Sequence, residues 1–258
     1  MECISLLGFG ACAPNPEFRA SLPFPAFGID RETIPPLWRR RTSQATQMAF
    51  SAAAAACRQA QRSPAALPSV FASVAGEIQT TDLLCNELVQ PEGSISPSAF
   101  HNSVQNTAVG YWSIAQQCTQ PASALAAGYD TFAMAMLEAW CQLDSLGGEI
   151  LLVCYDESWP KYLAPGQGEP AFACALVLAA GAAENGIAHI GRPHLGKEAF
   201  PPAWKSPAAS MPVLTAIPLL GLAVTGGKAQ NIPISRTDLG WQVKVQPIIT
   251  GQGLPWQP

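Results

Sequence analysis

Four runs of mostly apolar residues, each bounded by glycine, proline or a polar turn, constrain the fold of this chain more than any other feature. They cover residues 3–12, 69–76, 149–155 and 171–181. Runs that stay apolar at successive positions are typical of strands buried on both faces of a sheet. Between the first two, the alanine-rich stretch QATQMAFSAAAAACRQAQ, capped by Thr42 or Ser43, predicts a helix to about Arg62. Strand, helix and strand in this order predict a βαβ unit within an α/β fold.

The balance of charged and apolar residues predicts a partnered protein. At 258 residues the chain is long enough for one large domain with a buried core. Only 12% of its residues are charged and 48% are hydrophobic, whereas an ordinary soluble domain has roughly 25% charged residues. A surface so poor in charge predicts a large apolar interface with another protein. The net charge of −4 does not favour binding to nucleic acid. We interpret the basic run 39–41 as solvent-exposed residues just before a helix.

The eight cysteines are scattered along the chain and form no CxxC pair, so neither zinc binding nor a redox motif is indicated. We interpret them as reduced, buried residues. No window of about 18 apolar residues is free of glycine, proline or polar breaks, and the first residues lack the basic and apolar regions of a signal peptide. The sequence therefore predicts a cytoplasmic protein that binds no metal and no membrane.

One motif near the start superficially matches the dinucleotide-binding fingerprint: Gly8-x-Gly10-x-x-Ala13, with Asp30 downstream. That fingerprint needs a helix directly after the glycines, so that its N-terminal amides meet the pyrophosphate. Pro14 and Pro16 disfavour such a helix. We therefore expect no nucleotide cofactor.

A second organising feature is the stretch from Ser96 to Trp140, which contains two segments with helical periodicity. Ser96 caps the first predicted helix, and its apolar residues recur near a 3.6 period, giving one buried face: Phe100, Val104, Ala108, Tyr111 and Ala115. Polar residues occupy the other faces, either as satisfied core groups or as interface hydrogen-bonding groups: His101, Asn102, Gln105 and Asn106.

A turn of small residues, PASALAAG, joins the two segments at a place where an α/β enzyme would normally carry a nucleophile. Ser123 lies in this turn and Leu125 follows it, but the sequence has no GxSxG, HExxH or P-loop motif. Gly128 opens the second predicted helix, whose apolar stripe is typical of a core face: Phe132, Met136, Trp140 and Leu143. Spacing alone thus predicts a non-catalytic α/β domain that is obligately partnered.

Two segments of this stretch, SISPSAFHNSVQNTAVGYWSIA and PASALAAGYDTF, resemble the β-ketoacyl synthase family. The likeness extends to IPPLWRRRTSQATQMAFSAAAAA, VFASVAGEIQTTDLL and GEPAFACALVLAAG, and covers about residues 1–180. Within the family, the chain is most similar to the short chain length factors of aryl polyene gene clusters. The resemblance implies one thiolase-like domain over residues 1–258, truncated relative to full ketosynthases. Its sheet would be mixed, mostly parallel and covered by helices, with a divergent part from about residue 181 to 258.

The resemblance also implies that catalytic residues are absent. Setting Ala126-Ala127-Gly128 on the small residues after the family's nucleophile places Leu125 at the position of its cysteine. The two histidine segments of active ketosynthases are not found in this sequence. The implied protein is a non-catalytic subunit without a cofactor, which forms a heterodimer with an active ketosynthase and meets acyl carrier protein through that complex.

In such pairs the acyl chain on the partner's cysteine enters a tunnel, and a dry apolar wall with a bulky stop limits its length. The candidates for this wall or for the interface, each with an ordinary core position as its alternative, are Phe100, His101, Val104, Asn106, Tyr111, Trp112, Leu125 and Phe132. Two other functions stay open. One is a truncated ketosynthase-like acyltransferase that uses Cys118 or another thiol, with only His101, His189 and His194 available as a base. The other is a homodimeric scaffold without acyl contact.

Overall fold

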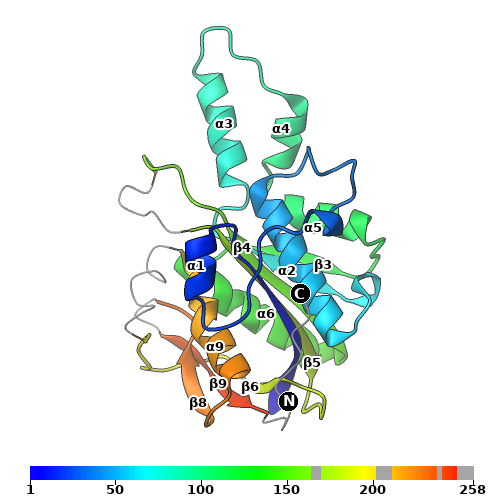
Figure 1. Cartoon of the computed structure of the whole chain (residues 1–258), viewed down its shortest axis with the longest axis vertical. Helices are drawn as coiled ribbons and strands as arrows, with labels where there is room; N and C mark the ends of the chain where they lie inside the picture. Colours follow the sequence, from blue (N-terminus) through cyan, green and yellow to red (C-terminus); the bar gives the residue numbers. More distant parts are fainter. Residues whose placement is uncertain (164–169, 202–210, 237–239, 249–258) are drawn as a thin grey trace.

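The computed structural model describes residues 1–163, 170–201, 211–236 and 240–248 (Figure 1). Its elements follow in this order: β1 (Cys3–Cys12), α1 (Pro16–Ser21), η1 (Arg31–Thr33), α2 (Gln44–Ala60), η2 (Pro64–Ala66), β2 (Ser69–Ala72), α3 (Ile78–Leu88), α4 (Pro97–Asn102), α5 (Thr107–Ala115), β3 (Ala122–Leu125), η3 (Gly128–Asp130), α6 (Thr131–Leu146), β4 (Glu149–Asp156), β5 (Phe172–Ala180), β6 (Ala188–Gly191), β7 (His194–Leu195), η4 (Pro212–Ala216), α9 (Ile217–Thr225), β8 (Gln230–Pro233) and β9 (Trp241–Pro247).

The described strands form one sheet in the order β3-β2-β4-β5-β1-β6-β9-β7, with β8 paired to β9. The expected mixed sheet covered by helices is confirmed, but the expectation that it is mostly parallel is wrong. Only β2 pairs in parallel with its neighbours, β3 and β4, and the other described pairings are antiparallel. One reason is that β4 and β5 are consecutive in the chain and pair side by side, which sets opposite directions when no crossover returns the chain.

The predicted βαβ succession is confirmed. β1 is antiparallel to β5, β5 is antiparallel to β4, and β4 is parallel to β2, so β1 and β2 run in the same direction on either side of α2 in the chain. Two strands, β5 and β4, lie between them in the sheet. Ser43, one of the two expected caps, accepts a hydrogen bond from the Thr46 backbone N–H at the start of α2.

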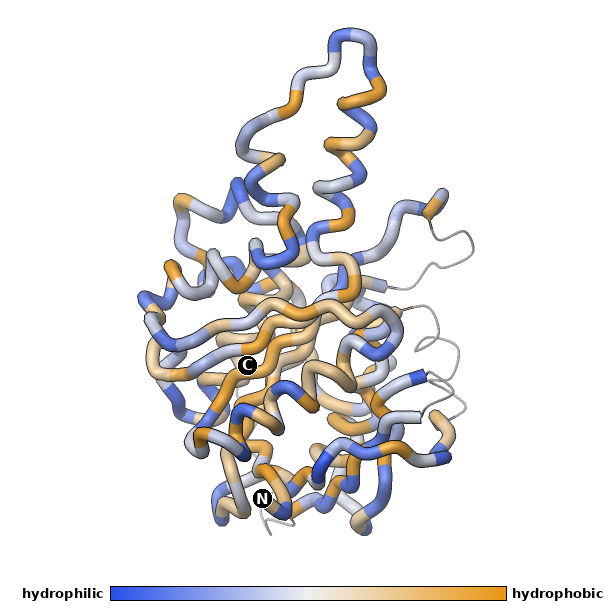
Figure 2. The backbone as a smooth tube through the Cα atoms, turned by 180° about the vertical axis from the view of Figure 1, so that it is seen from behind, coloured by the Kyte–Doolittle hydropathy of each residue, from blue (hydrophilic) through white to orange (hydrophobic). Residues whose placement is uncertain are grey.

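Helices cover both faces of the sheet and create two apolar cores. One core lies under α2 and α5, and the other lies under α6 and α9 (Figure 1). Successive residues of β4 alternate between them: Leu151 and Val153 face the first core, and Ile150 and Leu152 face the second. This two-sided burial explains why the central strands are continuously apolar, and Figure 2 shows them in the colours of hydrophobic residues.

The glycines of the apparent nucleotide motif allow α2 to lie close to β1. A Cβ atom at Gly8 would come within 2.6 Å of the Ala56 carbonyl oxygen, and one at Gly10 within 2.1 Å of that of Ala52. A helix does follow the motif, contrary to expectation, because a proline such as Pro16 is tolerated in the first turn. This helix, α1, has only six residues and is capped by Asn15. The close packing of α2 on β1 therefore explains why glycine stands at these two positions.

The stretch from 96 to 140 differs from the prediction in two places. The first predicted helix is divided into α4 and α5, since Asn102 is held in place by side-chain bonds. Its Nδ2 donates to the Arg41 carbonyl (2.6 Å), and its own carbonyl accepts from Thr107 Oγ1 (3.0 Å). The predicted small-residue turn is strand β3, which pairs with β2, and the second helix, α6, starts at Thr131 after the 3-10 turn η3.

An arm projects from the body of the molecule. It comprises α3, α4 and the loop between them, residues 78–102, and lies at the top of Figure 1. The short helix expected around residues 83–89 is confirmed as the second half of α3. Only Leu84 of α3 and Asn102 of α4 are buried.

The segments expected to be strands in the C-terminal part are confirmed as β6 and β9, with residues 249–250 of the second outside the described part. β6 pairs with β1, so these strands extend the same sheet. The buried helix α9 was not predicted, because its apolar run follows a proline-rich segment without a clear period. None of the helices in the described ranges combines the length and apolarity needed to cross a bilayer.

Candidate functional site

The strand β3 is an uncovered edge of the sheet. The Pro121 carbonyl accepts from Ser69 N–H (3.0 Å) and the Leu125 carbonyl from Ser73 N–H (3.1 Å), so the odd-numbered residues face β2. Because the N–H and C=O groups of one residue point to the same side and alternate along a strand, those of Ala122 and Ala124 point outward. The strand is short, with four residues, but contains no lysine, internal proline or bulge that would block pairing at the edge.

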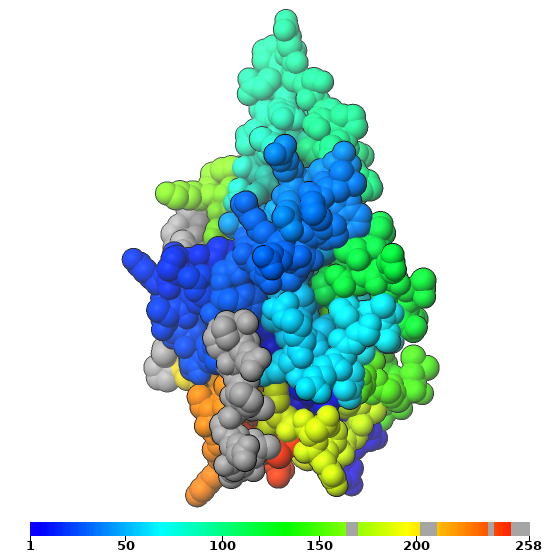
Figure 3. All heavy atoms as spheres, turned by 45° about the vertical axis from the view of Figure 1, so that its right-hand side comes forward, coloured from blue at the N-terminus to red at the C-terminus, as the bar shows by residue number. Residues whose placement is uncertain are grey.

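Large apolar side chains are exposed on α4, α5 and η3, on the side of the molecule that carries this edge. Phe100 on α4 is 63% exposed, Ile114 on α5 is 65% exposed and Tyr129 on η3 is 58% exposed, with Val104 exposed between α4 and α5. α5 packs directly against β3. Figure 3 shows this side of the molecule, with the arm above the segment that carries α5 and β3. A bare edge strand and a set of exposed apolar side chains together are typical of a protein interface.

The predicted buried face of the first helix is therefore only partly correct. Phe100 and Val104 are exposed, and Ala108 is buried. The break at residues 103–106 changes the direction of the chain, so the period does not continue from α4 to α5. His101 and Asn106 are also exposed, and the ring of His101 lies edge-on to that of Tyr111, with centroids 6.3 Å apart.

The remaining candidates lie further inside. The Tyr111 hydroxyl donates to Asn102 Oδ1 (2.8 Å), and its ring lies against Trp38. Trp112 is 1% exposed and packs against Phe50 and Phe71. Phe132 is fully buried in the other core. The structure thus brings Phe100, His101, Val104 and Asn106 to the surface near Tyr111, and it places Trp112 and Phe132 in the two cores.

Leu125 ends β3 and is partly buried against the core under α6. The turn after it holds no thiol or histidine. Ala127 N–H donates to Thr131 Oγ1 (3.0 Å), which donates to the Gly128 carbonyl (2.7 Å), and Gly128 has a φ of 55°, which glycine adopts without strain. The end of β3 therefore offers an apolar side chain, and the turn after it offers no thiol.

Thiols and histidines are not paired. His189 and His194 lie on β6 and β7, at the opposite end of the sheet order from β3. Cys118 precedes β3, and its thiol donates to the Leu67 carbonyl (3.5 Å). Among the described residues no cysteine is hydrogen-bonded to a histidine, and no group of His, Cys, Asp or Glu could hold a metal ion. All eight cysteines are free, but two are exposed, contrary to expectation: Cys85 and Cys141.

Beneath the edge lies a polar network that the sequence did not predict. Ser73, at the end of β2, is 1% exposed and makes four hydrogen bonds. Its N–H donates to Leu125 O (3.1 Å), its hydroxyl donates to Asp156 Oδ1 (2.8 Å) and accepts from Gly76 N–H (2.8 Å), and its carbonyl accepts from Gln105 Nε2 (2.8 Å). This one serine connects the ends of β3 and β4 to the break between α4 and α5.

Three carboxyl groups of this region are buried, and none of them forms a salt bridge with a described residue. Burial raises the pKa of Asp156 to about 7, although hydrogen bonds from Ser73 and the Val74 amide oppose the shift. Burial also raises the pKa of Glu157 to about 7, with the nearby Glu77 charge adding to the shift. Burial raises the pKa of Glu77, whose Oε1 accepts from Thr46 Oγ1 (2.6 Å). Asp156 is the last residue of β4, Glu157 follows it, and Glu77 comes after β2. These strands are parallel neighbours, so their carboxyl ends meet.

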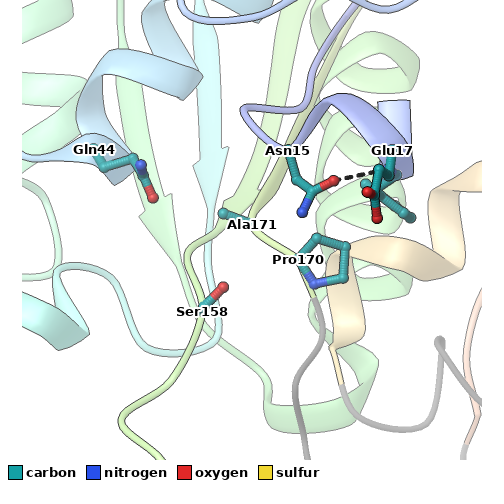
Figure 4. A pocket seen from close by; sticks show the side chains of 7 residues that line it. Asn15, Glu17, Gln44, Ser158, Pro170 and Ala171 are labelled. Atoms are coloured by element: carbon teal, nitrogen blue, oxygen red, sulfur yellow. Dashed lines mark hydrogen bonds between the residues drawn. The ribbon is translucent and has the colours of Figure 1, made fainter. Parts of the chain in front are cut away.

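A separate hollow of about 400 Å³ lies where β4 ends and β5 begins (Figure 4). Its lining comes from α1, α2 and the segments that flank β4 and β5, and contains Asn15, Glu17, Phe18, Gln44, Ser158, Pro170 and Ala171. None of these is a candidate from the sequence, and the lining has no cysteine, histidine or basic residue. It therefore provides neither a thiol nucleophile nor a histidine base.

Known proteins share sequence and fold with this chain. A family model described as "Beta-ketoacyl synthase, N-terminal domain" matches residues 13–216. Comparison with the sequences of curated proteins gives no match.

Three solved structures have a similar fold. A ketosynthase in complex with its chain length factor from Xenorhabdus doucetiae (ApeO and ApeC) matches with a TM-score of 0.69 and 22% identity, over 95% of this chain and 100% of that one. The ishigamide ketosynthase/chain length factor matches with a TM-score of 0.68 and 13% identity, over 96% and 100%. A type II polyketide synthase acyl carrier protein in complex with its ketosynthase bound to the hexaketide (AntDE:AntF) matches with a TM-score of 0.67 and 10% identity, over 96% and 100%.

Proposed function

Because this chain belongs to the β-ketoacyl synthase family by its N-terminal domain, we propose that it is a non-catalytic chain length factor, which forms a heterodimer with an active β-ketoacyl-ACP synthase. Its fold is the thiolase-like fold of ketosynthases, a mixed sheet covered by helices. The observation that carries the proposal is Leu125, an apolar residue at the end of β3, where the family resemblance places a nucleophilic cysteine. A leucine side chain cannot form an acyl thioester, so the chemistry belongs to the partner.

The proposed partner surface consists of the edge of β3 and the exposed apolar residues beside it, Phe100, Val104, Ile114 and Tyr129. Pairing along the edge would satisfy the outward N–H and C=O groups of Ala122 and Ala124. The apolar residues would then form part of the wall of the acyl tunnel, whose depth sets the length of the product. In this proposal residues 1–258 act as one domain, the product is of the aryl polyene type, and acyl carrier protein is met through the complex.

An acyltransferase that uses a thiol of this chain is the second candidate, and one observation weakens it. Cys118 lies at the opposite end of β3 from Leu125 and bonds to a backbone carbonyl. Its thiol therefore has no base beside it.

The first test is co-expression with the ketosynthase encoded beside this chain. We expect a one-to-one complex by size measurement, and no acyl adduct on any of the eight cysteines when the purified chain is incubated with an acyl thioester and weighed intact. A chain that stays alone in the presence of the ketosynthase would contradict the heterodimer. A stoichiometric acyl adduct on a cysteine would favour the acyltransferase instead.

Shortening Phe100 should lengthen the products. Phe100→Ala removes a ring whose volume corresponds to that of several methylene groups, so we expect a shift of about one extension unit or more if the ring is the stop of the tunnel. The variant should fold normally, since Phe100 is exposed in the isolated chain. Product length is measured by mass spectrometry on the complex. Leu146→Ala, which shortens an exposed side chain at the end of α6, is the control and should leave the products unchanged. Unchanged products from an intact Phe100→Ala complex would remove this ring from the wall.

A further inference from the structure

Charge is distributed very unevenly along the chain. Residues 63–160 contain no lysine or arginine, although they include ten of the 18 acidic residues, and all 14 basic residues lie outside this range. The same range builds the arm, α5, β3 and η3, which together form the proposed partner surface. These elements carry no lysine or arginine of their own, but the exposed basic run 39–41 lies against the base of the arm, where Asn102 Nδ2 donates to the Arg41 carbonyl.

The acidic side chains of the arm form no salt bridge with the described residues. Asp82, Glu87 and Glu92 lie on α3 and on the loop after it, and Glu92 is exposed. The salt bridges of the described residues join other groups: the N-terminus with Asp144, Arg58 with Asp30, and Arg62 with Glu149. Asp82 accepts hydrogen bonds from neutral groups only, Asn86 Nδ2 and the Tyr162 hydroxyl. Within the described part of the chain, the acids of the arm thus form no ion pair with a basic side chain.

The arm also exposes apolar side chains that it cannot cover itself. Leu83, Leu88 and Val89 on and after α3 are 54%, 61% and 76% exposed, and Phe100 lies on α4. Two short helices with a single buried leucine between them have too little core to be held by packing alone. Apolar side chains interspersed with unpaired acids are the complement of an apolar surface with a basic rim.

We infer that the arm, residues 78–102, docks on an apolar groove of the partner ketosynthase that is rimmed by lysine or arginine side chains. The inference rests on the proposed function and adds the chemistry of the partner's surface.

The test compares two charge reversals in the purified complex. Glu92→Lys should weaken binding to the ketosynthase about tenfold at low salt, and the difference from wild type should shrink at high salt, as for a charge at the rim of an interface. Glu184→Lys makes the same change of charge at an exposed turn between β5 and β6 and should bind like wild type. Binding is measured by titration at several salt concentrations.

The outcomes separate this inference from the proposed function. If the complex forms but both variants bind like wild type, the charge of the arm does not contribute and the inference is overturned, while the heterodimer stands. If no complex with the ketosynthase forms, both the proposed function and the inference fall.

Discussion

Replacing Ala124 by proline is expected to abolish co-purification with the partner ketosynthase. The N–H group of Ala124 points away from β2, so in the proposed complex it donates to a strand of the other subunit. Proline removes that donor and adds a ring at the edge, which leaves the acceptor of the paired strand unsatisfied at a cost of about 1–3 kcal/mol. A loss of that size weakens a complex roughly ten- to a hundredfold.

The same substitution should leave the isolated chain folded. The bonds of β3 to β2 are made by odd-numbered residues, as the carbonyls of Pro121 and Leu125 demonstrate, and none of these is changed. Circular dichroism and thermal unfolding of the chain alone check this point. Ala124→Val is the matched control, because it enlarges the side chain and keeps the N–H donor. An Ala124→Pro chain that is folded and still forms the complex would exclude edge pairing at β3 as the mode of association.

The difference between β3 and the other strands explains what the sequence could predict of the fold. β1, β4 and β5 are buried on both faces, and their continuous apolar runs are visible in the sequence. β3 consists of small residues at an exposed edge, Ala122 to Leu125, and has little intrinsic preference for a strand. It is a strand because β2 offers a free edge to pair with, and such tertiary effects override propensity.

The candidate site was predicted less completely, for two physical reasons. In the sequence, Phe100 and Trp112 lie in a stretch that looks like one continuous helix. In the structure, a break at residues 103–106 divides this stretch, so that Phe100 is exposed to solvent and Trp112 is buried in the core. The buried carboxyl groups were missed although Glu77 and Asp156 each follow an apolar strand in the sequence. Their proximity depends on β2 and β4 being neighbours, which the sequence pattern alone does not specify.

The second large effect concerns the buried carboxyl group of Asp156. Burial raises its pKa from 3.8 to about 7, so the folded protein binds this proton more tightly than the unfolded chain does. The stability that this group contributes is fully present below about pH 4 and is lost as the pH rises through about 7. A shift of this size corresponds to roughly 4 kcal/mol. We expect the variant Asp156→Asn, which stays neutral, to lack this loss.

The measurement is the free energy of unfolding of both proteins between pH 4 and pH 8, by denaturant titration. The quantity to follow is the difference between wild type and variant, because it cancels the contributions of the other titrating groups. This difference should move in favour of Asp156→Asn by a few kcal/mol as the pH rises. Glu184→Gln, at an exposed turn, controls for the change in net charge. A wild-type-minus-variant difference that stays flat across this range would mean that the buried carboxyl is ionised throughout it.

The pH dependence should extend from stability to partner binding, because Asp156 accepts from the Ser73 hydroxyl, and Ser73 also bonds to Leu125 and Gln105. Leu125 ends the edge strand, and Gln105 lies in the break beside Val104 on the proposed partner surface. Ionisation of a buried carboxyl without a cation weakens the structure around it, and here that structure orients the surface. We therefore expect wild-type binding to the ketosynthase to weaken above about pH 7 and Asp156→Asn to reduce this dependence, since its amide oxygen still accepts from Ser73.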